Sequence, residues 1–432
     1  MIDMGPKKAL AVLLAGLLAA SAVATGAAPP AAAAPQSPSS GVDDRAGEVF
    51  WRGAWTAAQQ PLNPNVPGWA QRGFTGQSVR QVVRISVGGS HVRIRLSNLY
   101  GTAPLPLTGA TIARAGAGAA LHRGSQRHLT FSDRQWAQIP AGAELDSDPL
   151  LMRTSPLEKL TVTLYFARPT GRATYHSRAT ATSYLANGDH RVDPTAGAFT
   201  GRSGSWYFLT RVDVREDRAR QRDGIVALGD SITDGYGSTP NADNRYPDEL
   251  AERLVRNNTP RPVLNAGISA NRVLSDSPCG GESATARFRR DVATQSGVRT
   301  VIVLEGINDI RSQGGTTGCS RGAPRITAQR LIDGHRYLIK WARERGLTVI
   351  GATLTPCSCV GTNEAIRNEV NRWIRSTAGT ANGYDAIADF DTALANPTNR
   401  HALRPAYDSG DHLHPNNAGY RRMAEAIPLA KL

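Results

Sequence analysis

The spacing of apolar residues changes once along the chain, and this change limits the folds open to it. From about residue 49 to residue 213 apolar and polar residues alternate, as in the run from Val83 to Val87, which is the period of a strand with one buried face. After residue 216, short apolar runs alternate with longer amphipathic segments, which is typical of buried parallel strands separated by helices. The chain of 432 residues exceeds one typical domain, so we expect two domains of different class.

The first domain, residues 49–218, is predicted to be an all-β sandwich with a jelly-roll-like arrangement of strands. Residues 83–87 and 92–96 flank the turn at residues 88–90, which predicts an antiparallel hairpin. Further strands are expected at residues 108–113 and 161–166.

The second domain, residues 219–432, is predicted to be an α/β domain with a parallel sheet and helices on both faces. Its expected strands lie at residues 224–228, 263–264, 300–304, 347–352 and 386–388. Its expected helices lie at residues 246–257, 283–294, 326–345, 363–376 and 417–427. In such a sheet the reactive groups gather at the carboxyl ends of the strands.

Residues 1–27 have the pattern of a signal peptide. Lys7 and Lys8 precede an apolar stretch from Ala9 to Ala24, and small residues follow where cleavage would occur. Residues 28–48 are rich in Pro, Ala and Ser without periodicity, which indicates a disordered linker. No later run approaches the ~20 apolar residues of a membrane span, so we expect a soluble, secreted protein.

The formal net charge of +14 comes from basic residues spread along the whole chain. A nucleic-acid-binding protein would concentrate this charge in one basic motif, so we do not expect nucleic acid as a partner. A dispersed positive charge fits weak association with an anionic cell surface or an acidic polysaccharide better.

Four cysteines stand in the second half, and an even number in an exported chain favours two disulfides. These are Cys279, Cys319, Cys357 and Cys359. A metal site is the alternative, but the cysteines form no C-x-x-C pair and no histidine stands at zinc-finger spacing. We favour pairing of the first two with each other and of the last two in a very small ring, while pairing across the two sets stays open.

A serine follows the first strand of the second domain, in the sequence GDSITDG over residues 229–235. At the carboxyl end of a parallel strand and ahead of a helix, Ser231 has its hydroxyl at the reactive edge and its backbone N–H free to donate. Asp-Ser beside glycine also occurs in plain turns, so the serine needs a base to be a nucleophile.

A base is available near the C-terminus, where Asp411 stands three residues before His414. From this spacing a carboxylate can hold the Nδ1–H of the imidazole. His412 is a competing base, but only Ser409 stands three residues upstream of it. An exposed polar loop that leads into a helix is the alternative interpretation of the motif.

The two following strands end in residues that can donate hydrogen bonds to an oxyanion. One ends at Gly267, which places a backbone N–H at the sheet edge, and the other leads into Asn308, which places a side-chain amide there. Taken singly, Gly267 is a turn glycine and Asn308 a loop cap. Their joint placement with the Ser231 N–H predicts an oxyanion hole.

The order of four sequence blocks resembles that of the SGNH hydrolase superfamily, the GDSL esterases and lipases. The blocks are GDSITDG at Ser231, Gly267, GIND at Asn308 and DHLH ending at His414. The resemblance covers essentially the whole second half and implies a three-layer α/β/α fold. It assigns Ser231 as nucleophile, Asp411 and His414 as the rest of a triad, and Ser231, Gly267 and Asn308 as oxyanion donors. More loosely, the first half resembles the N-terminal domain of secreted bacterial members grouped with xylanase-associated acylhydrolases, in the run VRIRLSNLYGTAPL.

The resemblance implies a secreted serine esterase acting on a small-molecule or polysaccharide ester, and we expect short acyl groups. No metal or organic cofactor is needed, because side chains and backbone supply nucleophile, base and electrophile. Two alternatives stay open. One is a lipase or phospholipase for longer-chain lipid esters, although no amphipathic segment resembles a lid, and the other is a non-catalytic carbohydrate-binding protein.

Overall fold

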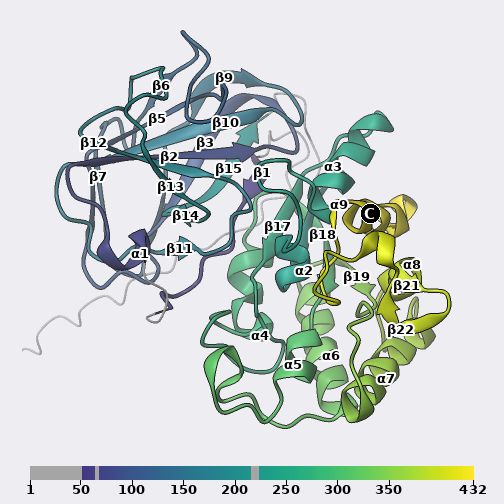
Figure 1. Cartoon of the computed structure of the whole chain (residues 1–432). Helices are drawn as coiled ribbons and strands as arrows, with labels where there is room; N and C mark the ends of the chain where they lie inside the picture. Colours follow the sequence, from purple (N-terminus) through teal and green to yellow (C-terminus); the bar gives the residue numbers. More distant parts are fainter. Residues whose placement is uncertain (1–50, 64–67, 216–222) are drawn as a thin grey trace, which may run out of the picture. The chain divides into compact units, whose positions relative to one another are not determined.

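The computed structural model describes residues 51–63, 68–215 and 223–432 (Figure 1). The predicted signal peptide, the predicted linker and the predicted domain boundary at residues 218–219 lie outside these ranges and stay predictions. In the described residues, no helix combines the length and the apolar character that crossing a membrane requires.

Short strands dominate the first half of the described chain. They are β1 (Trp51–Thr56), β2 (Gln77–Arg84), β3 (Gly89–Ser97), β4 (Leu105–Leu107), β5 (Gly109–Arg114), β6 (Arg127–Leu129), β7 (Ala137–Ile139), β8 (Glu144–Asp146), β9 (Leu150–Thr154), β10 (Lys159–Phe166), β11 (Tyr175–His176), β12 (Ser183–Asn187), β13 (Gly201–Ser203), β14 (Trp206–Tyr207) and β15 (Leu209–Arg215), with one short helix α1 (Trp69–Arg72).

Two antiparallel sheets share one core in this half. One has the strand order β1-β15-β3-β8, with β9 also paired to β3, and the other has the order β13-β12-β2-β10-β5-β6. Side chains of both sheets meet in a single apolar cluster, such as Ile94 from β3 and Val162 from β10. A β domain is therefore present, while the jelly-roll arrangement stays a prediction.

The predicted hairpin between residues 83–87 and 92–96 is wrong. β2 pairs with β10 and β12, whereas β3 pairs with β15, β8 and β9, so the chain passes from one sheet to the other after Arg84. Ile85 and Val87 are buried at this crossing because their side chains fill the shared core. The alternation of apolar and polar residues indicates that a strand has one buried face, but it does not indicate which strand pairs with it.

The second half alternates strands and helices, as its sequence predicts. Its strands are β16 (Gly224–Gly229), β17 (Val263–Gly267), β18 (Val298–Leu304), β19 (Thr348–Ala352), β20 (Ala386–Ala388), β21 (Ala395–Asn396) and β22 (Asn399–Leu403). Its α-helices are α2 (Ser231–Asp234), α3 (Tyr246–Arg256), α4 (Ala284–Phe288), α5 (Ile307–Ser312), α6 (Ala328–Glu344), α7 (Gly361–Thr377), α8 (Phe390–Leu394) and α9 (Asn417–Ala426).

A parallel sheet with the order β17-β16-β18-β19-β20 forms the centre of this half. On one face Val226 and Leu228 pack in a core with residues of α4, α6 and α7. On the other face Ile225 and Ala227 pack with residues of α3, α8 and α9. Helices therefore cover both faces (Figure 1), and the predicted α/β fold with a parallel sheet is confirmed.

The sheet order brings three strand ends together. Gly229 at the end of β16 lies beside Gly267 of β17 on one side and Leu304 of β18 on the other. A Cβ atom on Gly267 would lie 2.3 Å from the backbone nitrogen of Asp234 in α2. The absence of a side chain at Gly267 is therefore what allows α2 to pack against the end of β17.

Both disulfides have the pairing that we favoured from the sequence. Cys279 is joined to Cys319 across 40 residues, and Cys357 is joined to Cys359 across a single intervening residue.

Replacing Cys279 and Cys319 together with serine should lower the free energy of unfolding by about 4 kcal/mol, because the bond restricts the unfolded chain over a long loop. The matched double change at Cys357 and Cys359 should cost about 1 to 2 kcal/mol, since the loop that it closes is very short. Denaturant unfolding without reductant measures both. Equal losses in the two variants would contradict this prediction.

Candidate active site

Ser231 is the first residue of α2 and follows directly on β16. The side chain of Asp230 caps the helix by accepting a hydrogen bond from the Ile232 N–H at 2.9 Å. Burial, reinforced by the nearby charges of Asp309 and Asp234, raises the pKa of Asp230 to about 7. The backbone N–H of Ser231 has no acceptor among the described residues. The serine is thus held at the sheet edge with a free donor beside its hydroxyl.

The Ser231 hydroxyl, His414 and Asp411 form a continuous chain of hydrogen bonds. Ser231 Oγ lies 2.8 Å from His414 Nε2, and His414 Nδ1 lies 2.5 Å from Asp411 Oδ2. The other carboxylate oxygen of Asp411 accepts the backbone N–H of His414 at 2.8 Å. This second bond fixes the carboxylate in the turn before α9, so the imidazole is oriented toward the serine.

His412 has a carboxylate partner that the sequence reasoning missed. Its Nδ1 lies 2.6 Å from Asp408 Oδ2, four residues upstream. The side chain of His412 is 73% exposed, and no bond joins it to Ser231 in the described part of the chain. His414 alone of the two histidines contacts the serine.

The charges in this group favour a neutral imidazole next to an ionised carboxylate. Burial lowers the pKa of His414 below its ordinary value, although the Asp411 carboxylate opposes the change. Burial alone would raise the pKa of Asp411, but hydrogen bonds from His414 and Leu413 outweigh it and lower the pKa to about 2. A neutral histidine can accept a proton, which is what a general base must do.

Of the two predicted oxyanion donors Asn308 and Gly267, the first keeps a free N–H among the described residues and the second does not. The Nδ2 amide of Asn308 donates to the Asn271 carbonyl at 3.0 Å, which leaves its second N–H for another acceptor. The Gly267 N–H already donates to Asn265 Oδ1 at 2.9 Å.

A further N–H in this loop has no acceptor among the described residues, namely that of Ala270. Ala270 lies in the turn after β17, with φ at +64°, a region that non-glycine residues rarely adopt. The turn is tied to α2, because Asp234 Oδ2 accepts the N–H of Ser269 at 3.0 Å. A positive φ at an alanine has no signal in the sequence, so sequence reasoning could not find this donor.

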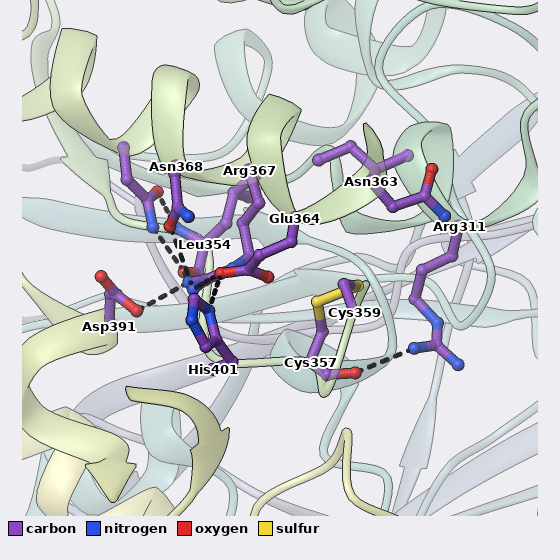
Figure 2. Close-up of a disulfide and its surroundings, with 12 residues drawn as sticks. Arg311, Leu354, Cys357, Cys359, Asn363, Glu364, Arg367, Asn368, Asp391 and His401 are labelled. Atoms are coloured by element: carbon purple, nitrogen blue, oxygen red, sulfur yellow. Dashed lines mark hydrogen bonds and ion pairs between the residues drawn. A yellow bond between two sulfur atoms is a disulfide. The ribbon is translucent and has the colours of Figure 1, made fainter. Parts of the chain in front are cut away.

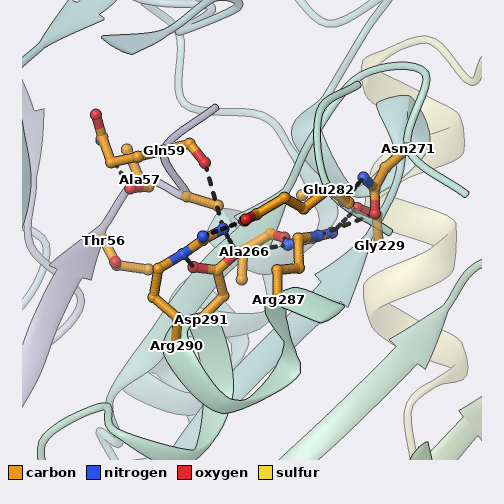
Figure 3. A network of polar contacts seen from close by, with 12 residues as sticks. Thr56, Ala57, Gln59, Gly229, Ala266, Asn271, Glu282, Arg287, Arg290 and Asp291 are labelled. Atoms are coloured by element: carbon orange, nitrogen blue, oxygen red, sulfur yellow. Dashed lines mark hydrogen bonds and ion pairs between the residues drawn. The ribbon is translucent and has the colours of Figure 1, made fainter. Parts of the chain in front are cut away.

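Arg287 lies beneath the strand ends and connects them (Figure 3). Its guanidinium is fully buried and donates to the carbonyls of Gly229 at 2.9 Å and Ala266 at 2.7 Å, and to Asn271 Oδ1 at 2.9 Å. The Asp291 carboxylate balances its charge at 3.1 Å, since the nearby arginines lower the pKa of Asp291 despite its burial. Glu305 Oε1 lies 3.3 Å away, and burial raises the pKa of this carboxyl. The ends of β16 and β17 and the loop that contacts Asn308 are therefore fixed by one side chain.

The first half of the chain contributes a buried histidine to this region. His176 Nδ1 lies 2.8 Å from the Ala58 carbonyl, and its Nε2 lies 2.9 Å from Asp234 Oδ1. Both ring nitrogens face oxygen acceptors, which requires an N–H on each and so a charged imidazole. Burial by itself lowers the pKa of His176, but the Asp234 carboxylate outweighs it and the pKa is raised. No sequence motif marks this pair.

A stack of side chains from both halves covers His414. The ring of Tyr236 lies 4.2 Å from the imidazole, measured between centroids. The guanidinium of Arg178 lies 4.2 Å from the centroid of the same tyrosine ring. Burial is the main cause of the lowered pKa of His414, and the positive charge of Arg178 lowers it further. The orientation of the His414 imidazole and its pKa thus depend in part on a residue from the first half.

The small Cys357–Cys359 ring lies beside Arg311 and Glu364 (Figure 2). With Ile307 it forms an apolar cluster against which Leu413 packs, and these two residues precede Asn308 and His414 in the chain. Arg311 donates to the Cys357 carbonyl at 3.1 Å. Cys357, Cys359 and Glu364 lie close enough to hold a metal ion, but the disulfide occupies both sulfurs. Packing explains the Cys-Ser-Cys motif, for which the sequence suggested no role.

Residues 227–422 match the sequence model of the GDSL-like lipase/acylhydrolase family. This part of the chain belongs to that family, within the SGNH hydrolase superfamily that the motifs resemble, and the protein is an ester hydrolase. A search of curated proteins finds no match to the chain.

Two solved structures illustrate the similarity. A GDSL-like lipase from Bacteroides thetaiotaomicron is 16% identical over 48% of this chain and 87% of that one, with a TM-score of 0.35. An acetyl xylan esterase from Geobacillus stearothermophilus is 21% identical over 48% of this chain and 93% of that one, with a TM-score of 0.35. At these values we base the family assignment on the sequence match alone.

The stability that the His176–Asp234 pair contributes should decrease as the pH rises. Because the pKa of His176 is raised in the folded protein, this contribution is fully present below the unfolded value of about 6.5 and is lost as the pH passes the folded value. The difference in unfolding free energy between the wild type and His176→Gln should therefore be larger at pH 6 than at pH 9, as measured by denaturant titration.

The exposed His122 offers a matched control. His122→Gln should show no comparable change between the two pH values, because its exposed side chain has no acidic partner among the described residues. A difference for His176→Gln that stays constant from acid to alkaline pH would refute a charged His176.

Proposed function

We propose that the protein is a secreted serine esterase that cleaves short-chain carboxylic esters through an acyl-enzyme on Ser231. The observation that carries the proposal is the unbroken contact from Ser231 Oγ through His414 to Asp411, at 2.8 and 2.5 Å. A serine hydroxyl is a weak nucleophile unless a base removes its proton, and this geometry provides the base.

The reaction has two steps. His414 Nε2 takes the Ser231 proton as the hydroxyl attacks the ester carbonyl, and then returns a proton to the departing alcohol. Water then enters and gives a proton to His414 as it attacks the acyl carbonyl, and His414 returns that proton to Ser231 Oγ as the acid leaves. Asp411 holds the Nδ1–H throughout and stabilises the imidazolium that forms in each step.

The oxyanion would be held by the Ser231 N–H, the Asn308 amide and one backbone N–H of the loop after β17. We assign this third role to Ala270 rather than to Gly267, because the Gly267 N–H is engaged by Asn265. Fixed donors aimed at the developing charge need no rearrangement during the reaction. Asn271 orients the Asn308 amide by accepting one of its hydrogens.

The acyl group would lie against the cluster of Ile307, Cys357, Cys359 and Leu413. These side chains are apolar, and the first three are buried beside two residues of the site. Because a disulfide links two of these residues and the cluster is closely packed, a long acyl chain cannot easily push the cluster aside. Short acyl groups therefore fit this arrangement better than long ones.

Export is the part of the proposal that depends on the sequence alone. Residues 1–27 have the signal-peptide pattern, and two disulfides suit an oxidising compartment. The charge of +14 would favour residence near an anionic cell surface or polysaccharide.

Ser231→Ala and His414→Ala should each reduce kcat on 4-nitrophenyl acetate by about 10⁴-fold or more, because nucleophile and base act as one unit. Asn308→Ala should reduce it by about 10² to 10³-fold, since two backbone donors remain. His412→Ala is the matched control and should retain most of the activity, because this histidine is exposed and paired with Asp408. Loss of activity in His412→Ala with activity kept in His414→Ala would reverse the assignment.

Turnover should be fastest on acetyl to about hexanoyl esters and should fall for longer chains, because the acyl wall is small and rigid. The measurement is kcat/KM across 4-nitrophenyl esters from acetate to palmitate. A maximum at long chains, especially above the solubility limit of the substrate, would support the lipase alternative instead.

A further inference from the structure

A groove of about 400 Å³ opens beside the side chains that cover His414. One wall comes from the first half of the chain, from residues 178–182 and from β13. The other wall is the segment of residues 237–240 that follows α2. The groove therefore lies where the β domain meets the segment carrying the nucleophile.

The two walls are held together by hydrogen bonds to Asn241. Its backbone N–H donates to the Thr180 carbonyl at 2.8 Å, and its side-chain oxygen accepts the Thr182 N–H at 2.7 Å. The Ala179 N–H donates to the Gly204 carbonyl at 2.7 Å and joins the loop to β13. The groove is therefore formed before any ligand binds.

The lining is positively charged and rich in hydroxyl groups. Arg178 and Arg202 are its ionisable residues, and no carboxylate is among the residues that line it. Both arginines are exposed, and within the described ranges neither makes an ion pair with an acidic side chain. Thr180, Ser203 and Ser238 add hydroxyl groups. Each hydroxyl already bonds within the chain, to the Ala179 carbonyl, the Tyr207 hydroxyl and the Gly235 carbonyl respectively, so its oxygen offers a ligand chiefly an acceptor. A lining of this kind suits a hydroxyl-bearing anion.

The groove is two side chains away from the base. Arg178 lies over Tyr236, and Tyr236 lies over the imidazole of His414, each at 4.2 Å. Arg178 also lines the groove, so a ligand bound there lies next to the side chains that cover His414.

We propose that this groove binds the alcohol part of the ester and selects an acidic oligosaccharide, with a uronate carboxylate held between Arg178 and Arg202. The proposal rests on the esterase function proposed above and names its substrate class. Guanidinium groups bind carboxylates in a planar, two-point fashion, and the hydroxyl groups suit the sugar ring.

A lipid fits the groove less well. The large apolar side chains that are exposed in the described chain are Trp136, Leu151, Val192, Tyr236, Tyr337 and Val360. None of these side chains lines the groove, although Tyr236 directly precedes Gly237 in its wall, and membrane-docking surfaces need a continuous apolar patch. The positive charge of the chain, +14, attracts an acidic polysaccharide without such a patch.

Arg202 is the informative residue, because Arg178 also stacks on Tyr236. Arg202→Gln should raise KM for acetylated oligogalacturonate by about tenfold while kcat changes little, since a charge-assisted hydrogen bond to the bound alcohol is lost. Its kcat and KM on acetylated xylo-oligosaccharide and on 4-nitrophenyl acetate should stay within about twofold, because these substrates carry no charge.

Arg123→Gln removes one exposed positive charge elsewhere on the β domain and is the matched control. It should leave KM unchanged for all three substrates, which separates a local site from the net charge of the protein. An unchanged KM for oligogalacturonate in Arg202→Gln, in an enzyme that cleaves 4-nitrophenyl acetate, would overturn the groove proposal and leave the esterase function intact.

Two other outcomes are decisive. A wild-type enzyme without activity on any of the three esters would defeat the esterase function itself. An Arg202-dependent preference for a soluble short-chain anionic phospholipid over the oligogalacturonate would show that the anion is a phosphate headgroup, and would overturn the carbohydrate assignment.

Discussion

The buried guanidinium of Arg287 holds the reactive edge of the sheet in place. A fully buried arginine must find acceptors for its five N–H groups, because an unpaired charge in the interior is very costly. The carbonyls at the ends of β16 and β17 and the side chain of Asn271 supply these acceptors. The same contacts that satisfy the charge therefore set the spacing between Ser231 and the loop that orients Asn308.

The β domain takes part in the site rather than only adjoining it. His176 bonds to Asp234 in the helix that begins at Ser231, and Asp234 in turn accepts a hydrogen bond from the turn that contains Ala270. Two residues further on, Arg178 covers the ring of Tyr236, which in turn covers the imidazole of His414. The helix of Ser231, the loop of Ala270 and the His414 imidazole are each linked to one short segment of the first half, so changes in that segment reach the site through a few side-chain contacts.

Sequence patterns predicted helices and strands well where the element was long and had one continuous buried face. The long amphipathic run at residues 326–345 became α6, Ala328–Glu344, because one apolar stripe can be satisfied only by packing on the sheet. The six-residue helix α5 was not foreseen, because so few residues show no period. The hairpin after β2 was wrong because the alternation of Val83 and its neighbours is equally compatible with pairing in either sheet.

The sequence by itself predicted contacts between residues that are close along the chain, but it did not determine contacts between residues that are far apart along it. Asp411 and His414 lie within one turn of each other, so their spacing by itself determined that a carboxylate could hold the imidazole, and the strand-ending motifs placed Ser231 and Asn308 at one edge. The contact of Ser231 with His414 spans 183 residues, and the pairs formed by His176 and Arg178 join different domains. Only the tertiary structure decided these, because burial, and with it the pKa of each group, depends on which surfaces the folded chain brings together.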